Sequence, residues 1–335
     1  MGRWGRTLPG LALLAAALGG CAPHAQSALA PAGPVARAEL GLIEHSLLIM
    51  LGVAVAVFAP LTYILLRFRE RPGDGREPVE TDGNRTLEIL WTAVPFALLL
   101  ILAIPTMRGT FALAAMPQGA AAVQVTVVGH QWWWEFDYPA YGIVTADEMH
   151  VPVGRPIDLT LRSADVIHSF WVPALAGKED TIPGEDLRTW LEADRAGTYP
   201  GQCAEFCGLS HSLMRMDVVA EPAAAFQAWA SGLQHPMVTP ATPLAAEGQA
   251  LFDQLGCGGC HAIAGTSAQG TVGPNLTGLG NRAVVVAGAL ANNPADLGQW
   301  LHDPQAIVAG TVMPSFPNLT ADQAQALETY LEGLK

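Results

Sequence analysis

Charged residues are scarce in this 335-residue sequence, at 14%, and it contains only five cysteines. The charges that do occur are mainly acidic and give a net charge of −13, and no basic stretch interleaved with aromatic residues is present. The sequence therefore argues against nucleic acid as a partner, because phosphate binding needs clustered Lys and Arg. Five cysteines leave none for a structural disulfide framework, since each falls in a motif described below. No internal repeat is evident.

Apolar residues, in contrast, are abundant. They make up 50% of the chain, and the mean hydropathy is +0.29. The length allows two domains in addition to membrane segments. This composition predicts a multidomain membrane protein with soluble parts.

The N-terminus has the form of a secretory signal over residues 1–20. Arg3 and Arg6 precede an apolar run, which ends in Leu-Gly-Gly-Cys21. This ending resembles a bacterial lipobox, so we expect a signal peptide and a lipoprotein with Cys21 as the lipidated first residue. The alternative is an ordinary signal cleaved after the Ala-Leu-Ala sequence at 28–30.

Two further apolar segments, residues 43–68 and 87–107, are long enough to span a bilayer, because ~20 helical residues cross its hydrocarbon core. Arginines gather in and beside the intervening loop, residues 69–86: Arg67, Arg69, Arg71, Arg76 and Arg85. The positive-inside rule places this loop in the cytoplasm. The prediction is a two-helix transmembrane hairpin, with residues 21–42 and everything after Met107 outside the membrane on the other side.

Residues 121–221 change to short runs rich in β-branched residues and broken by Gly and Pro. The runs 123–128 and 157–161 alternate apolar and polar residues, and 216–219 closes the series. Several short strands with such turn signals predict a Greek-key β-sandwich, the class that houses blue-copper sites. We therefore expect a cupredoxin-like domain.

Residues 222–243 are rich in Ala and Pro and are interpreted as a semi-rigid linker. Residues 244–335 follow, with helices predicted over 245–255 and over 320–334, the second capped by Thr320. Gly248 and Phe252 on the first helix and Tyr330 on the last are expected to pack where the two helices cross. Together with the haem-attachment motif described next, these two helices describe an all-α class I cytochrome c domain.

This last domain contains the sequence Cys257-Gly-Gly-Cys260-His261, the attachment motif of a c-type haem. Both thiols add to the porphyrin vinyl groups, and the histidine becomes the proximal iron ligand. Met313 is the expected sixth ligand. Met237 in the linker is a weak alternative, and His302 would give bis-histidine ligation with a lower potential.

A second cysteine motif offers two thiolates, an imidazole and a thioether in one loop: Cys203, Cys207, His211 and Met214. This is the soft donor set that selects copper. A distant ligand is also needed, and His168 in a predicted strand is the candidate. The extra thiolate, four residues after the first, allows two coppers to be bridged, whereas the alternative, a Cys203–Cys207 disulfide, leaves the histidine and methionine without a role.

Three segments carry a specific resemblance: Gly201–Met216, His168–Pro173 and Gly129–Phe136, the last with three consecutive tryptophans. They resemble subunit II of cytochrome c oxidase, and the haem motif makes the chain similar to the bacterial form with a C-terminally fused cytochrome c. The resemblance extends over about residues 40–335.

The resemblance implies a dinuclear CuA centre bridged by Cys203 and Cys207. One copper would also bind His168 and Met214; the other would bind His211 and the backbone carbonyl of Glu205. The carboxylate of Glu205 would point toward a magnesium site shared with subunit I, and Asp180 matches a family position near that site.

The resemblance also implies roles for residues outside the ligand set. Trp132 corresponds to the proposed electron entry point, with core filling or a membrane-interface anchor as the alternative role. Trp133 and Trp134 are interpreted as core filling or membrane-interface anchors. Glu88 matches a glutamate at the mouth of a proton pathway in subunit I, although it could also serve as an acidic residue at a helix N-terminus among lipid headgroups. The Pro274 carbonyl is expected to accept a hydrogen bond from His261.

We therefore expect the electron-entry subunit of a haem-copper terminal oxidase in a bacterial cell membrane. Covalent haem c would pass electrons to the copper centre and on to subunit I, where O2 is reduced to water with proton pumping. Expected partners are subunits I and III and an upstream cytochrome c or quinol–cytochrome c reductase. The competing interpretations are a nitrous oxide reductase, which needs a propeller domain, a copper chaperone, which needs no haem motif, and a quinol oxidase subunit II, which lacks the copper ligands.

Overall fold

The computed structural model describes residues 26–69, 82–116 and 122–335. The predicted signal peptide and Cys21 lie outside these residues, as do Arg71 and Arg76. By its internal contacts the chain divides into residues 37–116 and a second unit with the remaining residues, and the two are described separately.

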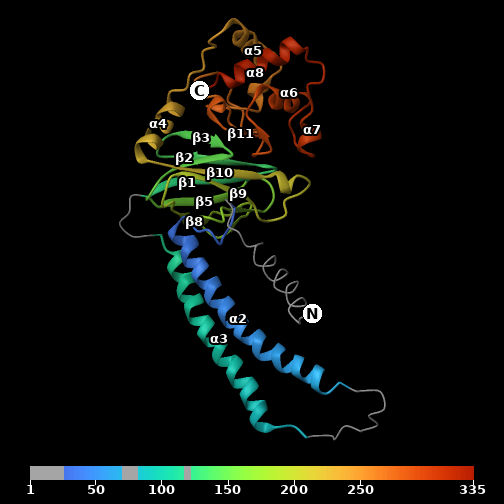
Figure 1. Cartoon of the computed structure of the whole chain (residues 1–335). Helices are drawn as coiled ribbons and strands as arrows, with labels where there is room; N and C mark the ends of the chain where they lie inside the picture. The colour runs from blue at the N-terminus through green and yellow to red at the C-terminus, as the bar shows by residue number, and fades with distance from the viewer. Residues whose placement is uncertain (1–25, 70–81, 117–121) are drawn as a thin grey trace, which may run out of the picture. The chain divides into compact units, whose positions relative to one another are not determined.

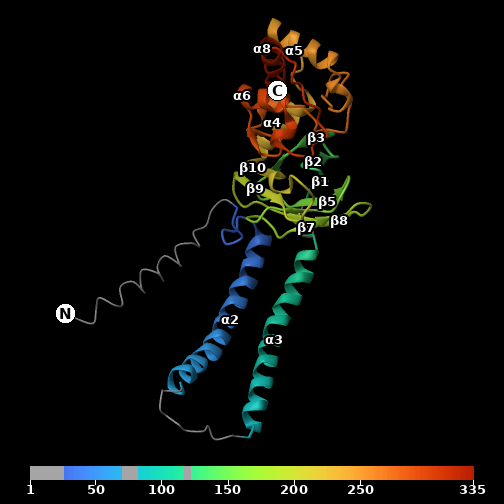
Figure 2. The same ribbon diagram turned by 90° about the vertical axis from the view of Figure 1, so that its right-hand side faces the viewer.

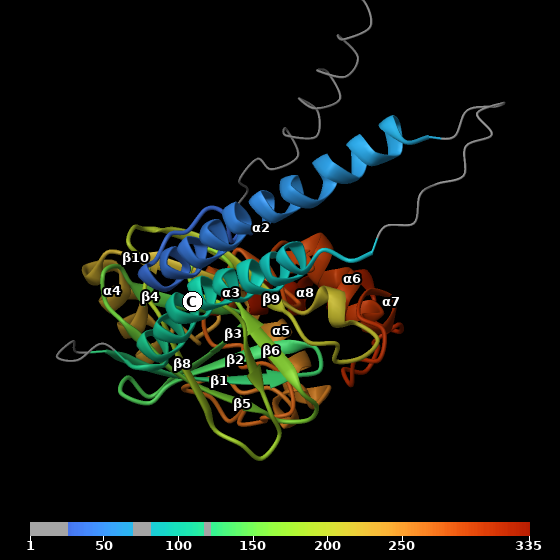
Figure 3. The ribbon, with the colours of Figure 1, turned by 90° about the horizontal axis from the view of Figure 1, so that it is seen from below.

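The first unit consists of two long helices, α2 (Pro34–Arg67) and α3 (Arg85–Ala114), which run in opposite directions (Figure 3). Their leucine, isoleucine and phenylalanine side chains are exposed on all sides, as expected for surfaces that face lipid. Asn84 caps α3 by accepting the Thr86 and Leu87 amides at 3.1 and 3.2 Å. Within the described residues, only these two helices are long and apolar enough to cross a membrane. The helix α2 starts at Pro34, ahead of the predicted residue 43, because proline suits the first turn of a helix.

The second unit contains the predicted β-sandwich, which Figure 2 shows as two layers. One sheet has the order β3-β2-β1-β5-β8, formed by Ile143–Ala146, Trp133–Tyr138, Val123–His130, Ile157–Ser163 and Leu187–Leu191. The other has the order β4-β10-β9-β6-β7, formed by Glu148–Pro152, Arg215–Glu221, Gly197–Cys203, His168–Trp171 and Glu179–Thr181. The parallel pairs β1–β5 and β4–β10 sit among antiparallel neighbours. The strands predicted at 123–128, 157–161 and 216–219 are confirmed as parts of β1, β5 and β10.

Alternation along the strands produces the core of the sandwich. In β1 every second residue from Val123 is buried. Phe136 and Leu159 are fully buried in the core between the two sheets. The segment before α2 adds to this domain: the Ala32 amide donates to the Ala174 carbonyl at 2.7 Å, and its carbonyl accepts from Asp194 at 2.9 Å. Residues ahead of the first long helix are therefore tied to the sandwich.

Residues 222–243, interpreted above as a linker, contain helix α4 (Ala223–Gln234). Phe226, Ala230 and Leu233 are buried along one face of this helix, at helical spacing. Trp229 stacks on His150 with ring centroids 4.4 Å apart. Apolar burial therefore overrides the composition signal over the first part of the segment, and the irregular part starts after α4.

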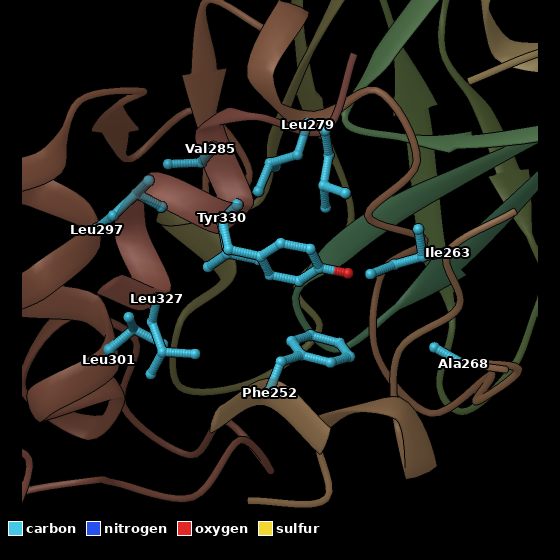
Figure 4. Close-up of a cluster of buried hydrophobic side chains, with 11 residues drawn as sticks. Phe252, Ile263, Ala268, Leu279, Val285, Leu297, Leu301, Leu327 and Tyr330 are labelled. Carbon is cyan, nitrogen blue, oxygen red and sulfur yellow. The ribbon is translucent and has the colours of Figure 1, made fainter. Parts of the chain in front are cut away.

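The C-terminal domain packs around helices α5 (Pro243–Gln254), α6 (Pro294–His302) and α8 (Ala321–Glu332), with the short elements η3 (Cys257–Gly259), η4 (Leu279–Asn281), α7 (Pro304–Ile307), β11 (Val284–Val285) and β12 (Leu290–Ala291) between them. Its core is apolar (Figure 4). The predicted crossing is confirmed: a Cβ on Gly248 would collide with the Ala326 backbone, and the Phe252 and Tyr330 rings meet edge to face at 5.7 Å. The Thr320 cap is confirmed as a full capping box with Gln323.

Candidate copper and haem centres

The copper-type residues come together at one end of the sandwich. Cys203 ends β9, and a loop through Cys207 leads to the short helix η2 (His211–Leu213) and Met214 before β10. The Cys203 amide donates to the Met214 carbonyl at 2.9 Å and closes the base of this loop. His168 begins the neighbouring strand β6, whose Phe170 pairs with Cys203. Sheet pairing thus brings a histidine distant in sequence beside the loop.

The donor atoms are spaced for metal binding. The Cys203 and Cys207 sulfurs are 3.8 Å apart, and Cys207 Sγ is 3.8 Å from Met214 Sδ and 3.4 Å from His211 Nδ1. Cys203 Sγ is 3.2 Å from the Glu205 carbonyl oxygen and 3.9 Å from His168 Nδ1. A disulfide needs sulfurs about 2.05 Å apart, whereas metal–thiolate bonds of about 2.3 Å suit the observed gap. The predicted ligand residues therefore fit a thiolate-bridged metal pair.

The predicted ligand side chains are largely buried, and their hydrogen bonding shifts the pKa values of the two thiols in opposite directions. His168 and Met214 are fully buried, and both cysteines are nearly so. The hydrogen bond from the Cys207 thiol lowers the pKa of Cys203 to about 3, despite burial. The pKa of Cys207 is raised, because it keeps the proton that it shares with Cys203. A bound cation would displace the thiol protons, because cysteine binds metals as the thiolate.

A residue that the sequence analysis missed, Asp165, orients the predicted histidine ligand. Its carboxylate accepts His168 Nε2–H at 2.7 Å, so that Nδ1 faces the sulfurs. It also accepts the Gln131 and Val166 amides at 2.7 and 2.6 Å. Burial opposes ionisation of Asp165, but these hydrogen bonds outweigh it and lower the pKa. Such partners fix the tautomer of a ligating imidazole. The sequence signal that could have identified Asp165 was its position, three residues before the candidate ligand His168.

The three tryptophans have three different environments. Trp132 is buried, and its Nε1–H donates to the Cys207 carbonyl at 3.2 Å, which connects it to a predicted copper ligand. Trp133 stacks on His130 with centroids 4.1 Å apart. Trp134 is fully buried and meets the His168 and Phe170 rings edge to face, which confirms its interpretation as core.

The haem-type residues lie in the C-terminal domain. Cys257 and Cys260 are in and at the end of η3, and both are free thiols. The predicted hydrogen bond between His261 and the Pro274 carbonyl is confirmed, because His261 Nδ1 lies 2.8 Å from that oxygen. This arrangement leaves Nε2 of the same ring available for iron. Burial lowers the pKa of His261 in spite of this hydrogen bond, so the imidazole is neutral at pH 7.

The packing around His261 leaves no room for a side chain at Gly273 of the adjoining loop. A Cβ on Gly273 would lie 2.6 Å from His261 Cε1. Met313 is half-buried against the domain core, whereas His302 is exposed and Met237 is 66% exposed. These environments favour Met313 over both alternatives as the sixth ligand.

The remaining predicted residues are placed as follows. Asp180 lies in β7 opposite Ser169 of β6, and the Glu205 side chain is half-buried in the copper loop. Glu88 is exposed in the first turn of α3, where its amide donates to the Asn84 carbonyl at 3.0 Å. Glu88 belongs to the helical unit and is not among the residues gathered at the copper-type site.

Comparison with known proteins gives three family matches that together span most of the chain. The transmembrane domain of cytochrome c oxidase subunit II matches residues 24–108, and the periplasmic domain of the same subunit matches 143–221. The cytochrome c family matches residues 245–335.

Similar proteins cover the whole length of the chain. A cytochrome c oxidase subunit 2 of Alkalihalophilus pseudofirmus is 41% identical over 98% of this chain and 97% of its own, and one of Bacillus sp. strain PS3 is 39% identical over 96% and 95%. A quinol oxidase subunit 2 of Bacillus cereus is 37% identical over 65% of this chain and 76% of its own. Among solved structures, the periplasmic domain of cytochrome oxidase subunit II from Bradyrhizobium japonicum is 32% identical, covers 35% of this chain and 95% of its own, and has a TM-score of 0.33.

Proposed function

The chain belongs to the cytochrome c oxidase subunit II family, and on that premise we propose that it is the electron-entry subunit of its complex, carrying electrons from a fused haem c to a dinuclear copper centre. As a member of this family it is a part of a haem-copper oxidase that works with partner subunits such as subunit I. The fused cytochrome c domain and the two apolar N-terminal helices support a role as a membrane-bound electron carrier.

The observation that carries the proposal is the convergence of the donor atoms around Cys203 and Cys207. When bound, copper and haem supply the one-electron redox change. The residues of this chain would keep the metal ligands in fixed positions. Asp165 fixes His168, the Cys203–Met214 hydrogen bond closes the base of the loop, and the Pro274 carbonyl fixes His261. Rigid ligands limit the structural rearrangement that accompanies each electron transfer.

We assign the copper ligands as the sequence resemblance implies. Cys203 and Cys207 would supply the two thiolates shared by the coppers, and His168, Met214, His211 and the Glu205 carbonyl would supply the remaining donors. The distances from 3.2 to 3.9 Å around the two sulfurs support this assignment. Cys257 and Cys260 would hold a covalent haem c, with His261 and Met313 as donors to its iron; the His261–Pro274 contact and the half-buried position of Met313 support this proposal.

We also propose an electron path between the two centres through Trp132. Its Nε1–H contacts the Cys207 carbonyl, and its ring lies against Gly310, where an added Cβ would be 2.7 Å from Cη2. Gly310 precedes Met313 by three residues in the haem domain. One buried side chain therefore contacts both a predicted copper ligand and the loop of a predicted haem ligand.

The proposal includes roles at the contacts with subunit I. The Glu205 carboxylate and Asp180 would face a magnesium ion shared with that subunit, and Glu88 would lie at the mouth of its proton pathway. Subunit III and an upstream cytochrome c or quinol–cytochrome c reductase complete the set of proposed partners. The copper and haem domains would face the outer side of a bacterial cell membrane, with a cleaved signal peptide and a lipid on Cys21.

The quinol oxidase alternative is weaker, although such a subunit matches part of the chain. A quinol oxidase subunit needs neither the copper ligands nor a haem domain, and this chain has a clustered set of donors and a cytochrome c match at 245–335. The clustered donors and the cytochrome c match support the cytochrome c oxidase alternative over the quinol oxidase one.

Electron paramagnetic resonance of the full-length chain, matured with haem and supplied with copper, tests the proposal. We expect a hyperfine pattern from one electron shared equally by two coppers, and we expect Cys207→Ser to remove it. Glu185→Ala, a change at an exposed residue of the same domain, is the matched control and should leave the spectrum unchanged. A single-copper pattern in the unaltered chain would refute the dinuclear assignment.

A further inference from the structure

Two adjacent acidic residues of the copper domain, Asp147 and Glu148, accept backbone amides from the haem domain; they are called the acidic corner below. Asp147 stands between β3 and β4; its Oδ1 accepts the Trp134 amide of its own domain, and its Oδ2 accepts the Ala287 amide of the haem domain, both at 3.0 Å. The adjacent Glu148 accepts the Ala283 amide through Oε1 at 3.0 Å. Two neighbouring carboxylates therefore bind two amides of one loop, which lies about 140 residues further along the chain.

The charges on the two sides are complementary. The haem domain contributes Arg282, whose pKa is lowered by burial, while the charges of Asp147 and Glu148 oppose this shift. The same arginine donates to the Asn275 and Thr277 carbonyls at 2.6 and 3.3 Å, so its position is fixed by its own domain.

Other titratable groups of the copper domain surround the same corner. Asp217 donates its amide to the Asp147 carbonyl at 2.9 Å, and His150 Nε2 is 3.8 Å from Glu148 Oε2. Burial raises the pKa of Asp147 to about 6, while the amide bonds and Arg282 oppose the rise. Asp147 is therefore ionised at pH 7, the form that accepts both amides.

The loop that enters this corner has an unusual backbone. Val286 and Ala287, in the connection between β11 and β12, have φ of 56° and 51°, and Asp147 itself has φ of 63°. A β-branched residue rarely adopts positive φ, and such conformations persist where surrounding contacts stabilise them. The bond from the Ala287 amide to Asp147 is one such contact, and it depends on the two domains being together.

A second contact between the domains lies beside the copper-type loop. Ser210 Oγ donates to the Ala309 carbonyl at 2.9 Å, and the adjoining Gly310 packs on Trp132 and Leu209. This contact has a single neutral hydrogen bond, whereas the acidic corner has two bonds to carboxylates. Bonds to charged acceptors are the stronger kind.

We propose that Asp147 and Glu148 are positioning residues, which dock the haem domain on the copper domain and so keep the 309–310 loop on Trp132 during electron transfer. The positioning role rests on the proposed electron path from haem to copper. The docking contact between the two domains does not depend on that path. The stretch after α4 tethers the haem domain, so docking is an intramolecular step in which a few bonds have a large effect.

Loss of one amide–carboxylate bond should lower the ratio of docked to undocked molecules about tenfold or more. Glu148→Ala removes the acceptor, whereas Glu148→Gln keeps an amide oxygen for the Ala283 amide and should restore most of the docking. Asp147→Asn has a single acceptor oxygen, so it cannot accept the Trp134 and Ala287 amides as the carboxylate does. Asparagine also tolerates positive φ, which preserves the turn.

The experiment uses the intact oxidase in detergent and makes two measurements on each variant. Hydrogen exchange over residues 282–291 reports docking through the Ala283 and Ala287 amides. Flash reduction of haem c by a photoexcited one-electron reductant, followed by haem and copper absorbance, reports the rate of transfer between the two centres. Glu185→Ala is the control of equal charge change, and the copper resonance spectrum checks that each variant is folded.

We expect Glu148→Ala and Asp147→Asn to speed exchange about tenfold and to slow haem-to-copper transfer about threefold or more, with Glu148→Gln close to the unaltered protein. Unchanged exchange in both variants would overturn the docking contact. Faster exchange with an unchanged transfer rate would overturn the positioning role. Protected amides in an unaltered protein that shows no haem-to-copper transfer would overturn the electron path and the role built on it, while establishing the docking contact.

Discussion

Replacement of Asp165 tests whether its hydrogen bond orients the His168 ring for copper binding. Asp165→Ala leaves the His168 Nε2–H without its partner at 2.7 Å, in a ring that is fully buried and that water does not reach. The imidazole then loses the contact that fixes its tautomer. We expect weaker copper binding, because partners of ligating histidines typically contribute 10- to 100-fold in metal affinity.

The expected magnitude follows from the exposure of the two side chains. A hydrogen bond to a charged acceptor contributes roughly 1.5–3 kcal/mol, which corresponds to about 10- to 150-fold in affinity. The Asp165 side chain is 32% exposed, which favours the lower end of this range, about tenfold. Asp165→Asn keeps an acceptor oxygen for Nε2–H and should lose only about threefold.

Competition titration with a copper chelator, at fixed pH, measures these affinities in the full-length chain. The matched control is Asp186→Ala, which removes an exposed aspartate of the same domain that pairs with Arg162 at 2.6 Å. Equal copper affinities for Asp165→Ala and Asp186→Ala would refute the orienting role. A loss as large for Asp165→Asn as for Asp165→Ala would show that charge, and not the hydrogen bond, matters.

Three further predictions follow from the packing. Gly273→Ala would place a Cβ 2.6 Å from His261 Cε1, so we expect lower haem occupancy or a shifted haem potential, measured by absorbance during redox titration. Gly232→Ala, where an added Cβ in α4 meets no atom within 4 Å, is the control. Gly248→Ala would collide with the backbone of the last helix and should lower the free energy of unfolding of the haem domain by about 1–3 kcal/mol in thermal denaturation; an unchanged Tm would contradict the crossing. Burial raises the pKa of Asp147 to about 6, so the native state binds a proton more tightly than the unfolded chain. This stabilisation, ~3 kcal/mol, should be complete below pH ~4 and lost as pH rises through about 6, and a stability curve of Asp147→Asn with the same slope over that interval would contradict it.

The sequence predicted the haem attachment and the copper-type loop because both motifs are local. Cys257, Cys260 and His261 are within five positions, and Cys203 to Met214 form one loop between two strands. The alternating strands and the helix cap at Thr320 could also be predicted from the sequence, since each depends on residues that are neighbours in the chain. His168 was found only as a candidate, because its approach to the loop depends on the pairing of β6 with β9.

Composition misled the interpretation of residues 222–243. Alanine and proline there indicated a linker, yet the side chains of Phe226, Ala230 and Leu233 repeat at helical spacing and bury one face of α4. A single helical face is a weak signal in an Ala-rich segment, because alanine favours helix and also occurs in flexible chains.

The sequence by itself determined the local chemistry of this protein: two apolar helices, a β-sandwich, a pair of thiolates with soft partners, and a haem motif. The tertiary structure decided which distant groups support that chemistry. Asp165 holds His168, Trp132 lies between the copper-type loop and Gly310, and Asp147 accepts the Ala287 amide. The last two contacts join residues far apart in the chain, and only the packing of two folded domains brings such groups within hydrogen-bond distance.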